Sequence, residues 1–376
     1  MILLRFRNFL LLISFLILHQ SVWGQKFALQ NVNYKKGKII EPVSGFYDLS
    51  NDIKADRGAI ENTRIIQQAL NSHRRVLLPA LDLIISKKGL TLNSNNELYF
   101  RGSSTLIMEP NNLERYELLR VHHVENVKIY NANLVGDRIK HRGNVGEWGH
   151  GISICGSRNV LIHNFNIGDF WGDGLYIGAF KNKPSSKITV EKGFSNNNRR
   201  NAISVTSVDG LIMKDIVVAN SNGTKPMYGV CIEANSKLDE INNIIINGLR
   251  SVNNAEGGIM ISFYKMAGKG NAVQKDVNII VNNFEDRGSQ TSGILVAQIP
   301  DNFRNLTGKI AFTNVVVEGN RRPIIIRTNA KKKFKISMTG VDIVRPLNKN
   351  FHNREFKRIH DNKTNISITL KENSRG

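Results

Sequence analysis

The chain has 376 residues, and 52 Lys and Arg against 31 Asp and Glu give it a formal net charge of +21 at pH 7. Two cysteines are too few for a disulfide-held fold, and the scattered basic residues lack the interleaved aromatics of a patch for a nucleic-acid partner. The charge suits an acidic polysaccharide as partner, but it equally suits solvated side chains that protect exposed strands.

The N-terminus has the pattern of a secretory signal peptide. Arg5 and Arg7 precede an apolar run over residues 9–18, and small residues nearby suit cleavage after Gly24. The run is short for a membrane span of ~20 residues. The pattern therefore predicts a signal peptide over residues 1–24. The mature protein is then secreted, periplasmic or on the cell surface, with no integral membrane span.

Residues 25–86 are predicted to form an N-terminal cap and the first strands. Apolar residues spaced three and four apart predict a short amphipathic helix over residues 62–72, and we expect Asn62 or Thr63 to cap its start. Two short aliphatic segments after the helix read as strands. A helix at this place would cover the open end of a solenoid and its apolar interior.

Residues 87–370 carry a repeat that predicts a parallel β-helix. A small residue opens each five-residue unit, and aliphatic residues follow at its second and fourth positions. The units begin at Gly151, Gly174, Ala202, Gly229, Gly258, Gly293 and Pro323. They are 23 to 35 residues apart, and a second short strand precedes each one. This pattern is typical of an all-β, single-domain solenoid, here of roughly ten coils with a tail over residues 371–376.

The segment before the repeats resembles a known family. Asp56-Arg-Gly58, Gln67 with Ala69-Leu70, and Val76-Leu-Leu-Pro79 are similar to the N-terminal segment of the pectate-lyase-like superfamily of right-handed parallel β-helix proteins. That superfamily includes polysaccharide lyases, glycoside hydrolases, mannuronan C5-epimerases and viral tailspikes. The resemblance implies a right-handed coil, but it does not define the reaction, because one fold hosts many chemistries.

The five-residue unit also assigns side chains to two faces. Its second and fourth residues should point into the core, and its third and fifth residues should point outward. The outward residues that we expect to be exposed in the early coils are Ser153, Tyr176, Ser204, Thr206 and Glu233. In later coils the outward residues are apolar, such as Met260 and Leu295, which indicates a covering loop or a homo-oligomer interface. Cys155 and Cys231 lie three coils apart, ~14 Å along the axis, which is too far for a disulfide.

The residue before each unit lies at a corner between strands, and four consecutive corners carry polar groups. These residues are His150, Asp173, Asn201 and Tyr228. At ~4.8 Å per coil they should form a column. Asp-Gly is also ordinary turn chemistry, so Asp173 does not require a catalytic role. The column is nevertheless the strongest candidate for a functional site.

Other reactive side chains gather around this column. The candidates for catalysis are Asp173, His150, Glu147, Asp169 and Glu233. The candidates for substrate binding are Trp148, Trp171, Tyr176, Arg199, Arg200, Asn201 and Tyr228. The two tryptophans can stack on sugar rings. The two arginines can neutralise a sugar carboxylate or merely cap exposed carbonyl groups.

Two mechanisms could use such a site. In a glycoside hydrolase, Asp173 would work with one of the other carboxylates as acid and base or nucleophile. In a lyase or epimerase acting on uronates, one of the arginines would neutralise the sugar carboxylate, and His150, Tyr176 or Tyr228 would take the neighbouring proton. A non-catalytic glycan-binding or adhesin-type protein is the alternative.

Family signatures do not separate these mechanisms. Gly149-His-Gly151 and Arg138-Ile-Lys140 match motifs of polygalacturonase-type hydrolases, but in reversed order, and that group's Asn-Thr-Asp and Asp-Asp motifs are absent. The epimerase motif Tyr-Gly-Phe-Asp-Pro-His is absent too. We expect no cofactor and no metal, because Asp169 and Asp173 offer two carboxylates where calcium prefers about six to eight oxygens.

Overall fold

The computed structural model describes most of the chain after the N-terminal segment. The described residues are 27–42, 44–54, 57–266, 273–299, 305–328, 334–348 and 365–371. The predicted signal peptide lies outside them, as do residues 372–376 of the predicted tail. The chain divides into residues 1–30 and residues 31–376, and the second part contains every element named below. Within the described residues, no helix is long and apolar enough to cross a membrane.

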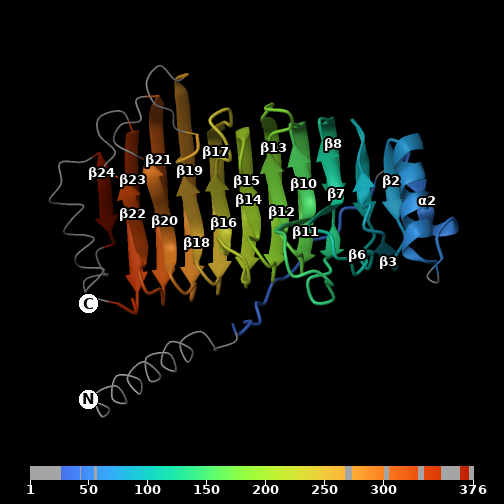
Figure 1. Cartoon of the computed structure of the whole chain (residues 1–376), viewed down its shortest axis with the longest axis horizontal. Coiled ribbons are helices and arrows are strands. Elements are labelled where there is room, and N and C mark those ends of the chain that lie inside the picture. The colour runs from blue at the N-terminus through green and yellow to red at the C-terminus, as the bar shows by residue number, and fades with distance from the viewer. Residues whose placement is uncertain are drawn as a thin grey trace, which may run out of the picture. The chain divides into compact units, whose positions relative to one another are not determined.

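Two parallel β-sheets form the second part of the chain, with their strands stacked side by side (Figure 1). Sheet A contains β1 (Tyr47–Asp48), β2 (Arg75–Leu78), β3 (Asp82–Ile85), β5 (Glu97–Phe100), β6 (Thr105–Met108), β8 (Glu125–Tyr130), β9 (Asn133–Val135), β11 (Arg158–Gly168), β13 (Ser185–Asn196), β15 (Val208–Ala219), β17 (Ile241–Val252), β19 (Lys275–Arg287), β21 (Leu306–Glu318), β23 (Phe334–Val344) and β24 (Ile366–Leu370).

The second sheet holds the five-residue units. Sheet B contains β4 (Leu90–Thr91), β7 (Arg115–His122), β10 (Trp148–Cys155), β12 (Leu175–Gly178), β14 (Ile203–Val205), β16 (Tyr228–Glu233), β18 (Gly257–Ser262), β20 (Ser292–Ile299) and β22 (Ile324–Thr328). Every pairing between these strands is parallel, and the chain makes about ten turns. The predicted right-handed parallel β-helix is therefore confirmed.

The core consists of aliphatic ladders that run from coil to coil. Ile152 pairs with Leu119 of the preceding coil and Leu175 of the following one, and all three are fully buried. The inward residues predicted from the repeat are all buried, namely Ile152, Ile154, Leu175, Ile177, Ile203, Val205, Val230 and Ile232. Each such side chain contributes about 1.5–3 kcal/mol through burial. The two cysteines, Cys155 and Cys231, are free thiols, as predicted.

The long strands of sheet A bend at a residue with a left-handed backbone. In β11 this residue is Asn164, with φ of 57°, and in β19 it is Asn283, with φ of 55°. Asparagine tolerates this conformation because its short polar side chain bonds locally. After the bend a second arm points Phe165 and Ile167 into the core. The sequence pattern did not predict this arm, because two inward residues are too few for a recognisable alternation.

Helix α2 (Ala59–Ser72) closes one end of the stack (Figure 1). It starts three residues earlier than predicted, and neither Asn62 nor Thr63 caps it; Gly58 is the N-cap residue and forms no side-chain bond. Thr63 lies inside the helix, where its hydroxyl donates to the Ala59 carbonyl and accepts from the N–H of Ser86. The predicted capping function of the helix is retained, because Ile66 and Leu70 are buried against the first coil.

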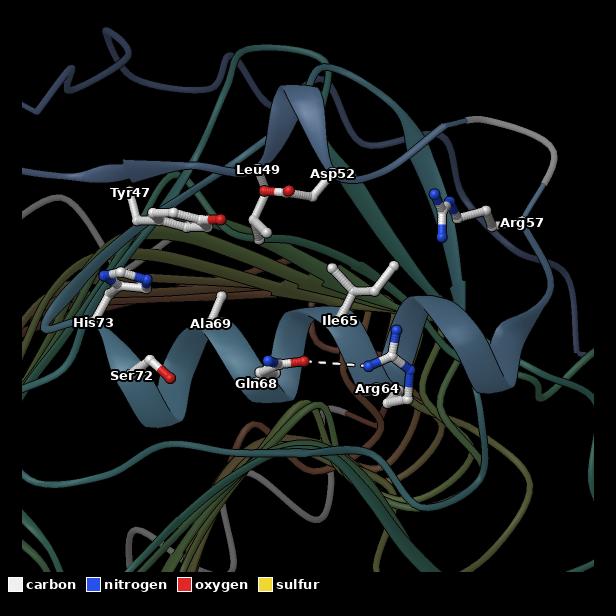
Figure 2. A pocket seen from close by; sticks show the side chains of 10 residues that line it. All are labelled: Tyr47, Leu49, Asp52, Arg57, Arg64, Ile65, Gln68, Ala69, Ser72 and His73. Carbon is white, nitrogen blue, oxygen red and sulfur yellow. Dashed lines mark hydrogen bonds between the residues drawn. The ribbon is translucent and has the colours of Figure 1, made fainter.

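A pocket of about 290 Å³ lies between α2 and the 3₁₀ helix Leu49–Asn51 (Figure 2). Tyr47 and His73 stack at one end with ring centroids 3.9 Å apart, and Arg57 and Arg64 line the other end. Both arginines pair with Glu61. None of the predicted site residues lines this pocket, so it is separate from the polar column.

An extended N-terminal strap, residues 31–42, crosses several coils of sheet A. The Asn131 side chain exchanges two hydrogen bonds with the main chain of Ile40, at 3.0 and 2.8 Å. Two coils further on, Tyr34 stacks on Phe194 with centroids 5.1 Å apart. Arg250 donates to the carbonyl of Asn33 at 3.1 Å. The strap therefore ties together coils that are far apart in the sequence.

Asp286 is a fully buried carboxyl group in sheet A. It accepts hydrogen bonds from Ser251 at 2.5 Å, Ser289 at 2.6 Å and Asn320 at 2.7 Å. Burial raises the pKa of Asp286 to about 6 in spite of these three donors. The folded protein therefore holds this proton more tightly than the unfolded chain does.

We predict a pH-dependent stability that Asp286→Asn removes. Stabilisation by the protonated Asp286 is fully present below the unfolded pKa near 3.8 and is lost as pH rises through about 6. Across that interval the wild type should lose on the order of 3 kcal/mol relative to the variant. Urea unfolding at several pH values measures the difference. Parallel pH profiles for the two proteins would contradict the prediction.

Candidate functional site

The four polar corner residues lie one above another along one edge of sheet B. The main-chain N–H of Asp173 donates to His150 Nδ1 at 3.3 Å, and that of Asn201 donates to Asp173 Oδ1 at 3.0 Å. The N–H of Tyr228 then donates to Asn201 Oδ1 at 2.9 Å. The side chains of His150, Asp173 and Asn201 thus each accept the main-chain N–H of the next coil's corner residue. The predicted column exists, and it satisfies buried backbone groups.

Burial limits what the column can contact. His150 and Tyr228 are each 4% exposed, and Asp173 and Asn201 have no exposed surface. The carboxylate of Asp173 therefore does not face the outer surface, contrary to its predicted role as an acid or nucleophile. It acts as a structural anchor for the residues around it.

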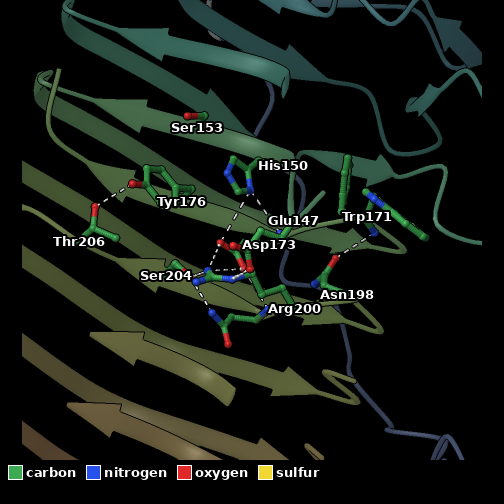
Figure 3. Close-up of polar contacts among 12 residues, drawn as sticks. Glu147, His150, Ser153, Trp171, Asp173, Tyr176, Asn198, Arg200, Ser204 and Thr206 are labelled. Atoms are coloured by element: carbon green, nitrogen blue, oxygen red, sulfur yellow. Dashed lines mark hydrogen bonds and ion pairs between the residues drawn. The ribbon is translucent and has the colours of Figure 1, made fainter. Parts of the chain in front are cut away.

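Arg200 lies between two of the predicted catalytic carboxylates (Figure 3). Its guanidinium donates to Asp173 at 3.0 Å and to Glu147 at 3.2 Å. Burial alone would lower the pKa of Arg200, but the nearby Asp173 outweighs it and holds that pKa above its usual value. Arg200 is thus a fixed cation with its charge already paired.

Asp169 and Glu233 do not join this cluster. Asp169 follows β11, accepts a hydrogen bond from Asn197 and lies near Arg138, and burial raises the pKa of its carboxyl. Glu233 is partly exposed at the end of β16. Within the described part of the chain, no hydrogen bond or ion pair links either of them to Asp173. The spacing of these residues in the sequence could not show that the turns of the coil separate Asp169 and Glu233 from Asp173.

The two predicted sugar-stacking tryptophans differ in their surroundings. Trp171 is sandwiched, with the ring of His141 at 4.0 Å on one side and the guanidinium of Arg199 at 3.8 Å on the other. Neither face of Trp171 is open to a sugar, which corrects the prediction. Arg199 also donates to two main-chain carbonyls, as in the capping role considered above. Trp148 is 38% exposed, with Arg115 5.0 Å from its ring centroid.

Tyr176, like Glu233, is a partly exposed outward residue. Its ring stacks on His150 with centroids 4.9 Å apart and an interplanar angle of 10° (Figure 3). Its hydroxyl accepts hydrogen bonds from Thr206 at 2.9 Å and Asn235 at 3.2 Å. Burial raises the pKa of Tyr176 to about 12 and lowers that of His150, so at neutral pH both rings are uncharged.

Three outward residues that were expected to be exposed are buried. Ser153 is 1%, Ser204 is 1% and Thr206 is 7% exposed. Larger neighbours cover these hydroxyls: Asn201 donates to Ser204 at 2.9 Å, and the His122 ring contacts Ser153 at 2.9 Å. An outward direction in a strand therefore did not mean contact with solvent.

The repeat missed three polar side chains of β7 that lie beside the predicted site. Glu117 pairs with His150 in register, Arg120 pairs with Ser153 and also forms an ion pair with Glu117 at 3.1 Å, and His122 pairs with Cys155. The β7 unit begins with Leu118 instead of a small residue, so the pattern did not include it. The alternation of inward aliphatic residues in β7, one coil before β10, was the signal that could have revealed this unit.

The outward apolar residues of the later coils pack against one another. Tyr228, Cys231, Met260, Leu295 and Ile325 form one cluster, and none is more than 9% exposed. They are buried within a single chain, so no second subunit is needed to cover them. The corner residue Tyr228 packs in this apolar cluster, and its hydroxyl lies 3.4 Å from Ser292.

Sequence comparisons give distant relatives without an assigned activity. No family model matches the chain. The SPbeta prophage-derived uncharacterized protein YorA of Bacillus subtilis is 26% identical over 275 residues, which is 67% of this chain and 41% of that protein. The uncharacterized protein YclG of the same organism is 29% identical over 166 residues, which is 40% of this chain and 28% of that protein. The chain spans less than half the length of each.

Structural comparison supports the fold. An iota-carrageenase complexed to iota-carrageenan fragments aligns with a TM-score of 0.59 over 91% of this chain and 95% of the enzyme, at 11% identity. A mannuronan C-5 epimerase A-module, AlgE6 of Azotobacter vinelandii, gives 0.46 at 15% identity over 86% of this chain and 98% of that module, which is too low for an argument. The chain therefore has the right-handed parallel β-helix fold.

We predict unequal costs for removing the two partners of Arg200. Asp173→Ala should destabilise the protein by about 3–5 kcal/mol, because a buried guanidinium loses its enclosed counter-charge. Glu147→Gln should cost less than about 1 kcal/mol, because Glu147 lies partly in solvent. Chemical denaturation of both variants measures the difference. Equal losses would show that Asp173 is not the anchor.

Proposed function

We propose that this chain is an exported carbohydrate-active enzyme that binds a polysaccharide on the outer face of β7, β10 and β12 and cleaves or modifies it. One observation carries the proposal. The uncharged rings of His122, His150 and Tyr176 belong to three consecutive strands of this face, and Trp148, two residues before His150 in β10, is exposed. The structural role of the corner column, which is to accept main-chain N–H groups, requires only hydrogen-bond acceptors. That role does not explain why aromatic rings lie on the outward face.

The binding surface favours an acidic sugar. Trp148 offers a flat apolar ring, which suits the face of a sugar. Arg115 lies over that ring and is exposed, and it forms no ion pair with any residue in the described ranges. The other arginines here, such as Arg120 and Arg200, are already paired with carboxylates. Arg115 is therefore the cation that we assign to a substrate carboxylate.

The fold and the N-terminal pattern support the rest of the proposal. The iota-carrageenase that shares the fold was seen with carrageenan fragments, so a β-helix of this length can hold a polysaccharide. The signal-like N-terminus supports export, because extracellular polysaccharides lie outside the cell membrane. We propose that the mature protein works as a secreted, periplasmic or cell-surface enzyme without a cofactor.

A panel of uronate-containing and neutral polysaccharides tests this function. Affinity electrophoresis measures binding, ultraviolet absorbance of an unsaturated uronate reports elimination, and new reducing ends without absorbance report hydrolysis. Turnover of any acidic member supports the proposal. Retardation without turnover of any polysaccharide would instead identify a glycan-binding or adhesin-type protein. Absence of both would overturn the proposal.

We predict that Trp148→Ala weakens polysaccharide binding about tenfold, because an exposed tryptophan that stacks on a sugar is an anchor of the interface. Tyr264→Ala is the matched control, since Tyr264 is 56% exposed but lies beyond β18, away from the polar face. Affinity electrophoresis against the retained polysaccharide compares the two. An equal loss in both variants would point to nonspecific aromatic binding.

A further inference from the structure

We propose that His122 is the general base of this site and that it removes the C5 proton of a uronic acid residue in the bound polysaccharide. The inference rests on the proposed function and narrows it to proton abstraction beside a sugar carboxylate. It draws on three arrangements on the outer face of sheet B: the pairing of the carboxylates, the contacts of His122 and the donors around Tyr176.

The carboxylates near the site are bound to arginines. Asp173 and Glu147 accept hydrogen bonds from Arg200 at 3.0 and 3.2 Å, and Glu117 accepts from Arg120 at 3.1 Å. A carboxylate that accepts from a guanidinium has no proton to donate. Hydrolysis of a glycoside needs a carboxyl group that does donate one. This arrangement therefore favours chemistry in which the rings, and not the carboxylates, move protons.

His122 is partly exposed at the end of β7, and one of its nitrogens is occupied. Nε2 lies 2.9 Å from Ser153 Oγ, which lies 3.6 Å from Cys155 Sγ. No described residue bonds to Nδ1. A hydroxyl group accepts and donates, so Ser153 can accept the Nε2 proton and leave the lone pair on Nδ1. When Nδ1 takes a proton, the bond to Ser153 is retained.

Tyr176 supplies the matching acid. Thr206 and Asn235 both donate to its phenolic oxygen, so its own hydrogen can be donated outward. His150 stacks on Tyr176, and its Nδ1 accepts a main-chain N–H, so its proton is on Nε2 and the ring is neutral. The three rings come from three consecutive coils of sheet B.

The elimination step balances with these groups. The C5–H bond breaks and its proton goes to His122 Nδ1. The electron pair left on C5 forms the C4–C5 double bond, and the C4–O glycosidic bond breaks. The leaving oxygen takes the phenolic proton of Tyr176. Solvent then carries the proton from the imidazolium to the phenolate, which restores both groups without any other reactant.

The charged and titratable groups around His122 define its pH dependence. Burial lowers its pKa; Glu117 opposes that shift, while Arg120 and His150 add to it, and Cys155 lies beyond Ser153. The ring is therefore neutral at pH 7. Turnover should fall as pH drops through a value below 6.5, the ordinary pKa of histidine.

Two measurements test the proposal, one without a substrate and the other with a substrate. First, diethyl pyrocarbonate is applied to the wild-type protein across pH, and modification of each histidine is followed by mass spectrometry. His122 should be modified, with a rate midpoint below 6.5. Its exposed neighbour His123 is the internal control. A His122 that resists modification while His123 reacts would overturn the proposal, whatever the polysaccharide results.

Second, turnover of the best acidic polysaccharide is measured for His122→Gln, Ser153→Ala and the control His123→Asn. His122→Gln should lower kcat at least about 100-fold with little change in affinity. Ser153→Ala should lower kcat less and shift the acid limb of the pH profile, and His123→Asn should match the wild type. In D2O, loss of the C5 proton supports the base. Hydrolysis that retains this proton, or full activity of His122→Gln, overturns it. If the wild type neither binds nor turns over, the proposed function itself fails.

Discussion

The register of sheet B is the constraint on which the other features depend. Parallel pairing places equivalent positions of successive coils directly above one another, so each position becomes a row. The inward rows must be aliphatic, because nothing polar can be satisfied there. The corner row must offer acceptors for main-chain N–H groups, and His150, Asp173 and Asn201 do so. Only the outward rows are left to vary, and there the chemistry changes from polar in the early coils to apolar in the later ones.

The same register explains which parts of this arrangement the sequence could predict. Inward positions were predictable because burial of aliphatic residues repeats in every coil. Exposure was not, because it depends on the size of neighbouring rows: Ser153 points outward but lies beneath His122. The enclosure of Trp171 depends on Arg199 and on His141, which comes from a loop between repeats. Such contacts involve loop residues, and the repeat does not define where a loop residue lies relative to the strands.

Net charge gave weak guidance to the site. The chain carries +21, yet Arg120 and Arg200 are paired with carboxylates on the polar face. Pairing turns these arginines into fixed supports, and a substrate carboxylate would have to compete with a side chain already in place. Charge that is counted over the whole chain says little about one surface, whereas the pairing of individual side chains separates supports from binding groups. Arg115 is assigned as a binding group because it forms no ion pair with any residue in the described ranges.

The N-terminal strap has a consequence for the order of assembly. It comes first in the described chain, yet its partners Asn131, Phe194 and Arg250 belong to coils that follow much later. The strap cannot dock until those coils have stacked, so its binding reports that the middle of the solenoid is complete. In a chain that is made from its N-terminus, this early segment is therefore the last to find its place. Once docked, its contacts join the coils of Asn131, Phe194 and Arg250 and oppose their separation.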